Sequence, residues 1–178
     1  MGEIGAPPPV RRIVSAIFSD RASLSGAVEA LAQEHGGVRQ LGQEMSFDFT
    51  DYYESEMGGN LRRGFFEVEG LVSSEELVAL KRFTSDVERR VAAPDGRRRV
   101  NLDPGILSAE RLVLASTKNA PHRLYLGRGI YAELTLVYQS GGFQALPWTY
   151  PDYASEAVRG LLCDVRKRYL AELKEGRA

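Results

Sequence analysis

The sequence predicts an α+β fold in which helices pack on a single sheet, and three observations support this prediction. Strand-like and helix-like segments follow one another in the order strand, helix, strand, strand, helix, strand. Hydrophobic residues make up 43% and charged residues 26% of the chain, which are ordinary values for a globular protein. The 178 residues fit one domain, because domains usually contain about 100–200 residues.

This order of segments is that of a ferredoxin-like βαββαβ unit. We expect the unit to be extended by a β-hairpin and a C-terminal helix. Residues 1–10 contain Pro7-Pro8-Pro9 and are expected to form a flexible, Pro-rich tail. Residues 11–176 are expected to form the single α+β domain.

The first strand is expected to be central in the sheet. Residues 12–19 would place apolar side chains on both faces, which is typical of a covered strand. A helix is predicted over residues 23–35, because apolar residues recur at helical spacing and Gly36-Gly37 follows them. Residues 38–49 are predicted to hold a second strand that is interrupted in its middle.

The next segments complete the predicted unit. Residues 63–69 predict a third strand. Ser73 and Glu76 have the spacing of a capping box and mark the start of the second helix. Residues 99–102 predict a short fourth strand, after which Asp103 and Pro104-Gly105 are typical of an Asx turn.

The remaining segments extend the unit. A short helix is predicted over residues 108–116. Residues 123–126 and 130–138 predict a hairpin around a glycine-rich turn. A final helix is predicted over residues 152–175, with Asp152 as its N-cap.

The charge distribution limits the classes of partner. The formal net charge is −1, from 23 basic and 24 acidic side chains. This balance argues against binding to nucleic acid or to an anionic membrane through bulk charge. Residues 97–128, however, contain seven bases and two acids, so this segment favours a local anion site.

Two further features bear on localisation. Cys163 is the single cysteine, so the chain cannot form an internal disulfide, as expected in a reducing compartment. The longest uncharged run, residues 134–151, contains glycine, proline and polar residues and predicts a strand and loop, not a membrane span. We therefore expect a cytoplasmic protein.

Four segments of the chain carry a family resemblance. They are Phe47 to Tyr53, Arg99 to Gly105, Ser116 to Glu133 and Pro147 to Tyr153. In order and spacing they resemble a prokaryotic family catalogued as domain of unknown function 4416. The resemblance implies no activity, because that family has none established.

Some members of that family carry an automatic GTP-binding label. A P-loop needs a lysine and a hydroxyl side chain after its glycines. Gly59 and Gly64 have the glycine spacing, but Phe65 stands where the lysine is required. A guanine-recognition motif is also missing from the sequence. The residues therefore give no support to the label.

The loop that enters the predicted hairpin is a candidate ligand site. Lys118, Asn119, His122 and Arg123 lie within a few residues and suit a phosphate or carboxylate. The alternative interpretation is a solvated turn. Further candidate ligand-binding residues on neighbouring segments are Tyr125, Arg99 and Trp148.

Glu133 is unusual because it lies in an otherwise apolar strand. A buried carboxylate is costly unless it is paired, and Lys118, His122, Arg123 or Arg99 would be its partner. In a pocket, Glu133, His122 and Asp103 would be candidates for proton transfer. The alternative interpretation of Glu133 is a structural salt bridge.

An acidic corner is the candidate metal site. Asp48, Asp51 and Glu54 are close in sequence, and carboxylates are ligands that Mg²⁺ or Mn²⁺ prefers. The alternative is that Asp51 caps a helix. No zinc site is expected, because His35, His122 and Cys163 are far apart in the sequence.

Two classes of function remain open on the sequence. The first is binding, with turnover undecided, of a small anionic ligand such as a nucleotide or phosphorylated metabolite. The second is a non-catalytic accessory module that binds protein or RNA. That module would use a sheet face with Phe65 and Phe66, or the basic side of the last helix. RNA is the less favoured partner, because Glu67 replaces a stacking aromatic residue.

Overall fold

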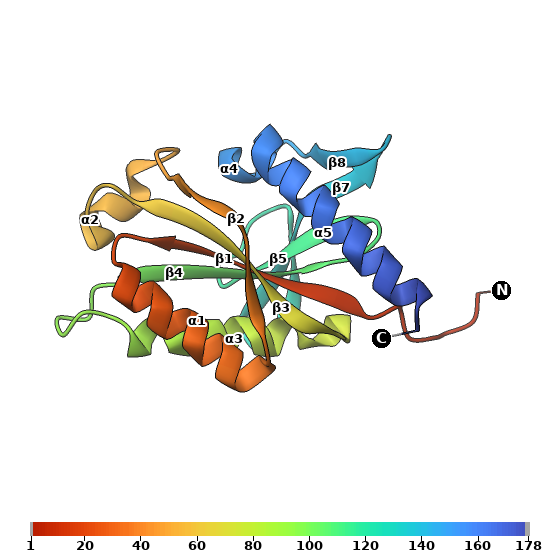
Figure 1. Ribbon diagram of the computed structural model, residues 1–178, viewed down its shortest axis with the longest axis horizontal. Helices are drawn as coiled ribbons and strands as arrows, with labels where there is room; N and C mark the ends of the chain where they lie inside the picture. The colour runs from red at the N-terminus through yellow and green to blue at the C-terminus, as the bar shows by residue number, and fades with distance from the viewer. Residues whose placement is uncertain (1, 177–178) are drawn as a thin grey trace.

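The computed structural model, which describes residues 2–176, contains one antiparallel sheet with helices on both faces (Figure 1). The eight strands run in the order β2-β3-β1-β4-β5-β7-β6, and β8 pairs with β7. The strands are β1 (Val10–Phe18), β2 (Val38–Ser46), β3 (Arg62–Val72), β4 (Val100–Leu107), β5 (Arg111–Ser116), β6 (Arg123–Gly127), β7 (Ile130–Gln139) and β8 (Gly142–Ala145). The helices are α1 (Arg21–His35), α2 (Glu54–Met57), α3 (Leu77–Arg90), α4 (Pro151–Ala154) and α5 (Glu156–Lys174), with 3-10 turns at Asp51–Tyr53 and Ser74–Glu76.

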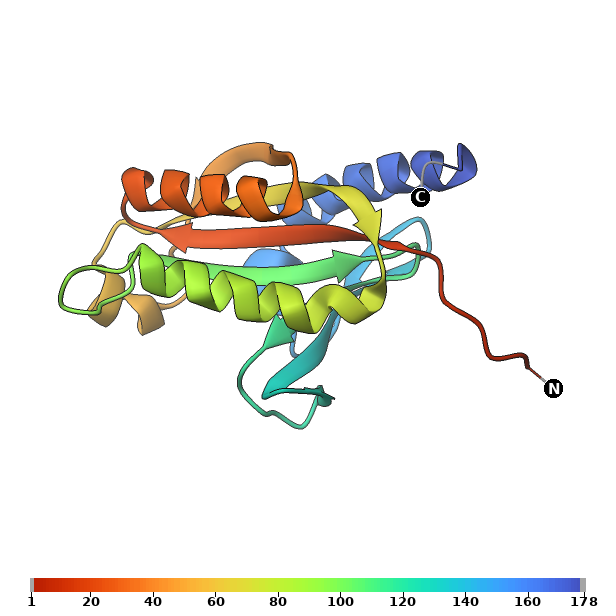
Figure 2. The same ribbon diagram turned by 90° about the horizontal axis from the view of Figure 1, so that it is seen from below.

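β1 lies in the middle of the sheet, as its apolar pattern predicts. All nine of its residues are buried, and it pairs with β3 on one side and β4 on the other. One core cluster packs α1 and α3 on one face, and a second packs α5 on the opposite face. Figures 1 and 2 show these layers on either side of the sheet. The two faces are therefore covered by elements from opposite ends of the chain.

The predicted first helix and the interruption in the second strand are confirmed. The Asp20 side chain accepts hydrogen bonds from the amides that begin α1, and Gly36 ends the helix with φ of 92°. In β2 the pairing with β3 shifts register between Leu41 and Met45. Gly42 lies in that stretch with φ of 64°, a conformation that glycine adopts without strain.

The fourth strand is longer than the sequence suggested, and the predicted Asx turn at Asp103 is wrong. Asp103, Pro104 and Gly105 all lie inside β4 and pair with β1. β4 pairs with β5 only from Gly105 onward. At Pro104, one edge of β4 therefore has no hydrogen-bonded neighbouring strand. Such a position tolerates a residue that lacks an amide hydrogen.

The helix predicted over residues 108–116 is also wrong, because residues 111–116 form β5. A short apolar run fits a helix or a strand equally well by periodicity. Leu112 and Leu114 are buried in the core under α5. The turn before β5 is fixed by Ser108, whose hydroxyl accepts a hydrogen bond from the Glu110 amide.

The predicted final helix is divided in two. α4 ends at Ala154, and Ser155 is the N-cap of α5, where its hydroxyl accepts a hydrogen bond from the Val158 amide. The expectation that Asp152 caps this helix is therefore wrong. Asp152 is buried and faces the sheet instead.

The predicted hairpin is present as β6 and β7, and it extends away from the helical layers (Figure 2). Within residues 2–176, the helices are all too short or too polar to span a membrane.

We predict that Gly105→Ala destabilises the protein. An added Cβ would lie 2.7 Å from both the Leu114 side chain and the Val113 carbonyl oxygen, so β5 would have to move. Such overpacking costs about 1–3 kcal/mol, measurable by urea unfolding. Gly160→Ala is the control, since nothing lies within 4 Å of its added Cβ in α5, and it should stabilise by about 0.5–1 kcal/mol. Equal effects of the two changes would contradict the prediction.

Candidate functional site

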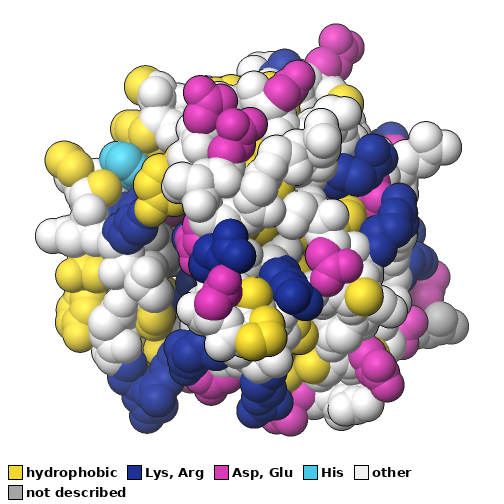
Figure 3. Space-filling view, turned by 90° about the vertical axis from the view of Figure 1, so that its left-hand side faces the viewer, with side chains coloured by type: hydrophobic (Ala, Val, Ile, Leu, Met, Phe, Trp, Pro, Cys, Tyr) yellow, Lys and Arg dark blue, Asp and Glu magenta, His cyan; other side chains and the backbone are white. Residues whose placement is uncertain are grey.

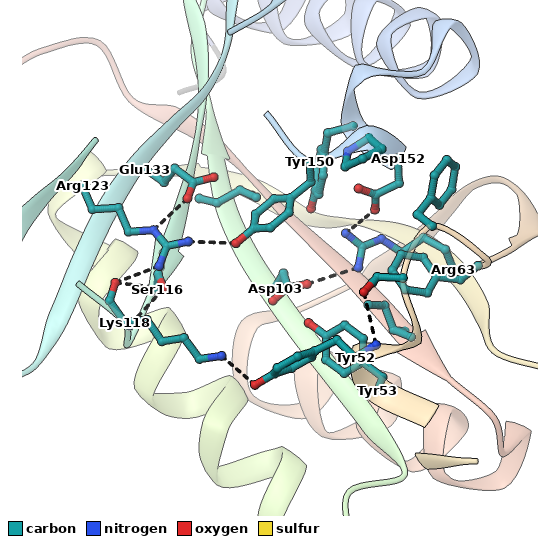
Figure 4. A pocket seen from close by; sticks show the side chains of 18 residues that line it. Tyr52, Tyr53, Arg63, Asp103, Ser116, Lys118, Arg123, Glu133, Tyr150 and Asp152 are labelled. Carbon is teal, nitrogen blue, oxygen red and sulfur yellow. Dashed lines mark hydrogen bonds and ion pairs between the residues drawn. The ribbon is translucent and has the colours of Figure 1, made fainter. Parts of the chain in front are cut away.

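A pocket of about 360 Å³ opens on the α5 side of the sheet, beside α4 (Figure 4). Its wall and floor come from β3, β4, β5 and β7, together with the segment that leads into α2. Its charged lining residues are the bases Arg63, Lys118 and Arg123 and the acids Asp103, Glu133 and Asp152. Its aromatic lining residues are Phe47, Phe49, Tyr52, Tyr53, Tyr150 and Tyr153.

Arg63 forms the floor of the pocket. Its side chain is buried, with Nη1 3.2 Å from Asp103 Oδ2 and Nη2 2.7 Å from Asp152 Oδ2. The contact with Asp152 is close enough for an ion pair, although its angles do not make a hydrogen bond. The guanidinium carbon also lies 5.1 Å from the ring centre of Tyr153, within range of a cation–π interaction.

Burial lowers the pKa of the Arg63 guanidinium, but Tyr153, Asp152 and Asp103 together outweigh this effect and raise it. Arg63 is therefore charged at neutral pH. Because both of its carboxylate partners are fixed in the pocket, the guanidinium is committed to the protein's own groups.

The pairing of the strands explains how Arg63 and Asp103 meet. Arg63 lies opposite Ile17 in the β1–β3 pair, and Asp103 lies opposite Ser15 in the β1–β4 pair. Residues two apart on a strand share a face, so both side chains emerge on the same side of β1. Asp152 reaches them from above because α4 lies over this face of the sheet.

Glu133 and Arg123 form the side wall. Glu133 is 1% exposed, and its Oε2 accepts a hydrogen bond of 2.7 Å from Arg123 Nε. Arg123 also donates to the Tyr150 hydroxyl and to the Lys118 carbonyl, each at 2.8 Å. Burial lowers the pKa of Arg123, and the hydrogen bond to Glu133 leads the contributions that raise it overall.

His122 stands behind this wall. Its Nε2 lies 3.3 Å from Glu133 Oε2, and its ring stacks on Trp148 with centres 5.2 Å apart. Of the four partners expected for Glu133, the structure brings Arg123 and His122 to it. His122 and Trp148 do not line the pocket themselves.

Lys118 and Tyr52 face each other at the pocket mouth (Figure 4). Lys118 Nζ donates a hydrogen bond of 2.8 Å to the Tyr52 hydroxyl and lies 4.6 Å from the ring centre. This hydrogen bond, followed by the charge of Lys118, lowers the pKa of Tyr52. Among the described residues, Lys118 makes no ion pair with a carboxylate.

Four of the predicted ligand-binding residues lie outside this pocket: Trp148, described above, and Arg99, Asn119 and Tyr125. Arg99 is exposed, 4.0 Å from Asp20, and borders a separate hollow. Asn119 is exposed on its loop. Tyr125 is exposed on β6, where its ring packs against Tyr131 with centres 5.2 Å apart.

The acidic corner does not form a cluster. Asp48 and Asp51 are exposed and do not line the pocket, and the 3-10 turn at Asp51 is capped by Thr50. The cap expected at Asp51 is therefore wrong. Within residues 2–176 no three His, Cys, Asp or Glu side chains come close enough to hold a metal ion.

Sequence reasoning missed three members of the site: Arg63, Asp152 and Tyr52. Arg63 carries a weaker form of the signal seen at Glu133: its direct neighbours are Arg62 and Gly64, but the residues two positions away, Leu61 and Phe65, are apolar. That signal could have identified it as buried and paired. No pattern in the sequence indicates that Tyr52 meets Lys118, since the two are far apart in the chain.

The pocket gathers residues from all four segments that carry the family resemblance. A family model described as Domain of unknown function (DUF4416) matches residues 8–169. The chain belongs to this family. No curated protein and no solved structure matches the chain. The family description names no activity.

We predict that Arg63→Met strongly destabilises this DUF4416 protein. The change leaves the buried Asp152 and the partly buried Asp103 without their cation, and loss of one partner of a buried pair typically costs about 3–5 kcal/mol, measurable by urea unfolding. Arg97→Met is the matched control, because Arg97 pairs with Asp95 on the surface, where such pairs contribute about 0–1 kcal/mol. If Arg63→Met costs no more unfolding free energy than Arg97→Met, the floor of the pocket does not depend on Arg63.

A second prediction concerns the ionisation of Tyr52. Lys118 stabilises the phenolate, so Lys118→Met should raise the pKa of Tyr52 and shift its ionisation to higher pH. Ultraviolet difference titration would measure this, with Tyr52→Phe identifying the transition. Lys167→Met, on the outer side of α5, should leave the titration unchanged. An unaltered transition in Lys118→Met would refute the contact.

Proposed function

We propose that the protein binds a small anionic ligand, of the size of a nucleoside monophosphate or a phosphorylated metabolite, in this pocket. The observation that carries the proposal is the position of Lys118. Arg63 and Arg123 are paired with carboxylates, whereas among the described residues the Lys118 ammonium contacts the hydroxyl and ring of Tyr52 and no carboxylate. A volume of about 360 Å³ suits one small molecule, because ligand pockets usually measure about 300–1,000 Å³.

The charges of the pocket limit the ligand to a modest negative charge. Its three bases are balanced by three acids among the lining residues. A triphosphate would place several negative charges beside Asp103 and Glu133, and like charges at short range repel. A single phosphate or carboxylate against Lys118 avoids this repulsion.

Two acceptors favour a ligand that also carries hydrogen-bond donors. Glu133 Oε1 is buried and has no hydrogen-bond partner among the described residues. An unsatisfied buried acceptor costs about 1–3 kcal/mol, which a donor on the ligand would recover. The Asp103 side chain is 28% exposed and offers a second acceptor. Hydroxyl or amino groups on the ligand, close to its anionic group, would donate hydrogen bonds to both Glu133 and Asp103.

Of the three groups that the sequence indicated for proton transfer, Asp103 is retained, and Tyr52 replaces Glu133 and His122. Asp103 and Tyr52 both line the pocket and are partly open to it. Glu133 instead holds Arg123 in place, and His122 supports Glu133 from behind. We therefore assign exchange of a proton with the ligand to Asp103 and Tyr52.

The surfaces considered for an RNA or protein module give that alternative little support. Phe65 and Phe66 are buried under helices on opposite faces of the sheet. On α5, Arg166 donates to the Ala109 carbonyl and Arg168 pairs with Glu67. These groups are already engaged within the chain.

We also infer that β1 to β4, with α1 and α3, form a ferredoxin-like unit. The strand order β2-β3-β1-β4 and its antiparallel pairing support this assignment. A cytoplasmic location is inferred too, and the single cysteine, Cys163, which leaves no internal disulfide to form, is consistent with it.

The test is a thermal-shift screen with nucleoside monophosphates, sugar phosphates and small hydroxylated carboxylates. A ligand at a hundred times its dissociation constant should stabilise the protein by about 2.7 kcal/mol. Lys118→Met should abolish the shift. Lys167→Met should retain it, because Lys167 pairs with Asp164 on the outside of α5. A shift that survives Lys118→Met, or silence across all three classes, would overturn the proposal.

A further inference from the structure

The edge strand β6 exposes an unusual run of hydrophobic side chains. Leu124 is 74% exposed, Tyr125 63% and Leu126 44%. These are consecutive residues, and consecutive residues of a strand point to opposite faces. β6 is therefore uncovered on both of its faces.

The arrangement of the sheet explains this exposure. β6 is the last strand in the sheet and pairs only with β7 within residues 2–176. Figure 2 shows the β6–β7 hairpin extending beyond the layer formed by α1 and α3. In Figure 3 hydrophobic side chains gather on a projecting part of the surface at the left of the view. A run of this kind on an open edge is where another strand can pair.

The opposite edge of the sheet is different. β2 presents the sequence Val-Arg-Gln-Leu-Gly-Gln-Glu-Met-Ser, and its pairing with β3 is broken between Leu41 and Met45. Arg39, Gln40 and Glu44 are polar, and Arg39 and Glu44 form ion pairs within the chain. Charges and bulges are devices that protect an edge strand from pairing. β6 carries no charge over Leu124 to Leu126, and its register shift, between Tyr125 and Gly127, lies at the end of the strand next to the turn.

We propose that β6 pairs antiparallel with β6 of a second copy of this chain, about a two-fold axis at Tyr125. The sequence around this residue is self-complementary in that register. Tyr125 would face its counterpart, and each Leu124 would face Leu126 of the other copy. Arg123 would face Gly127, so no two like charges meet. Aromatic and aliphatic cross-strand pairs of this kind stabilise a sheet.

This pairing also produces a closed dimer, with no β6 edge left free. An isologous contact uses the same surface in both copies and is complete at two. Pairing of β6 with β2 of another copy would instead build an open chain of molecules, and the polar, bulged β2 opposes it. The dimer would have one sheet continuous across both copies. The inference does not depend on the ligand proposed above, because β6 pairs through its outer edge.

Disulfide trapping tests the register directly. In a Cys163→Ser background, Tyr125→Cys should cross-link to itself under mild oxidation. Opposed residues in antiparallel strands have Cα atoms about 4.5–5.5 Å apart, within the range of about 4.4–6.8 Å that a disulfide spans. A mixture of Leu124→Cys and Leu126→Cys proteins should cross-link as well. Gln40→Cys, exposed on the opposite edge, is the matched control and should form no cross-link.

Sedimentation velocity supplies an independent readout on unlabelled protein. The parent chain should sediment as a dimer, and Tyr125→Lys should sediment as a monomer, because it places like charges opposite each other. Gln40→Lys should leave the dimer intact, and circular dichroism would verify that all three are folded. A parent chain that is monomeric at micromolar concentration would overturn the proposal. So would a dimer that persists in Tyr125→Lys, or trapping at Gln40 as strong as at Tyr125.

Discussion

The buried guanidinium of Arg63 sets the geometry of the candidate site. A cation in this position is tolerated only if carboxylates are brought to it, because an unpaired buried charge costs several kcal/mol. Asp103 comes from the sheet itself, two strands away across β1. Asp152 comes from α4, which lies over the sheet at this point. The break between α4 and α5 at Ser155 allows α4 to take this position, and Tyr150 and Tyr153 are placed over the pocket with it.

The other two bases of the pocket have different tasks, and their partners distinguish them. Arg123 is tied to Glu133, Tyr150 and the backbone of Lys118, so it holds the loop and the wall together. Lys118 projects from that loop toward Tyr52 without a carboxylate beside it. A planar guanidinium with several donors suits fixed contacts within the protein. An ammonium group on a flexible stem suits reversible binding of a ligand. The positioning of Lys118 therefore depends on Arg123, and through it on Glu133.

Local sequence patterns predicted much of the fold and only part of the site. The two-sided apolar pattern of residues 12–19, the cap at Gly36 and the glycine-rich hairpin are local signals, and the structure has all three features. Residues 108–116 failed because a short apolar run takes its conformation from its neighbours, here the adjacent strands. Glu133 was recognised as a paired charge, whereas Arg99 was grouped with the basic loop although it lies near Asp20. Contacts such as Tyr52 with Lys118 arise only from tertiary packing, which no local pattern encodes.

The edge strand and one wall of the pocket belong to the same hairpin, and this links the two proposals. Arg123 begins β6, and its side chain forms the pocket wall, while the backbone of the same strand presents the open edge. The hairpin projects beyond the helical layers, so β6 is held mostly by its pairing with β7 and by the Arg123–Glu133 contact. A second copy paired along β6 would restrict the motion of this wall. By thermodynamic linkage, this coupling is reciprocal. If the dimer increases the affinity for a ligand that binds only when the wall is in place, that ligand increases the affinity between the two copies by the same factor.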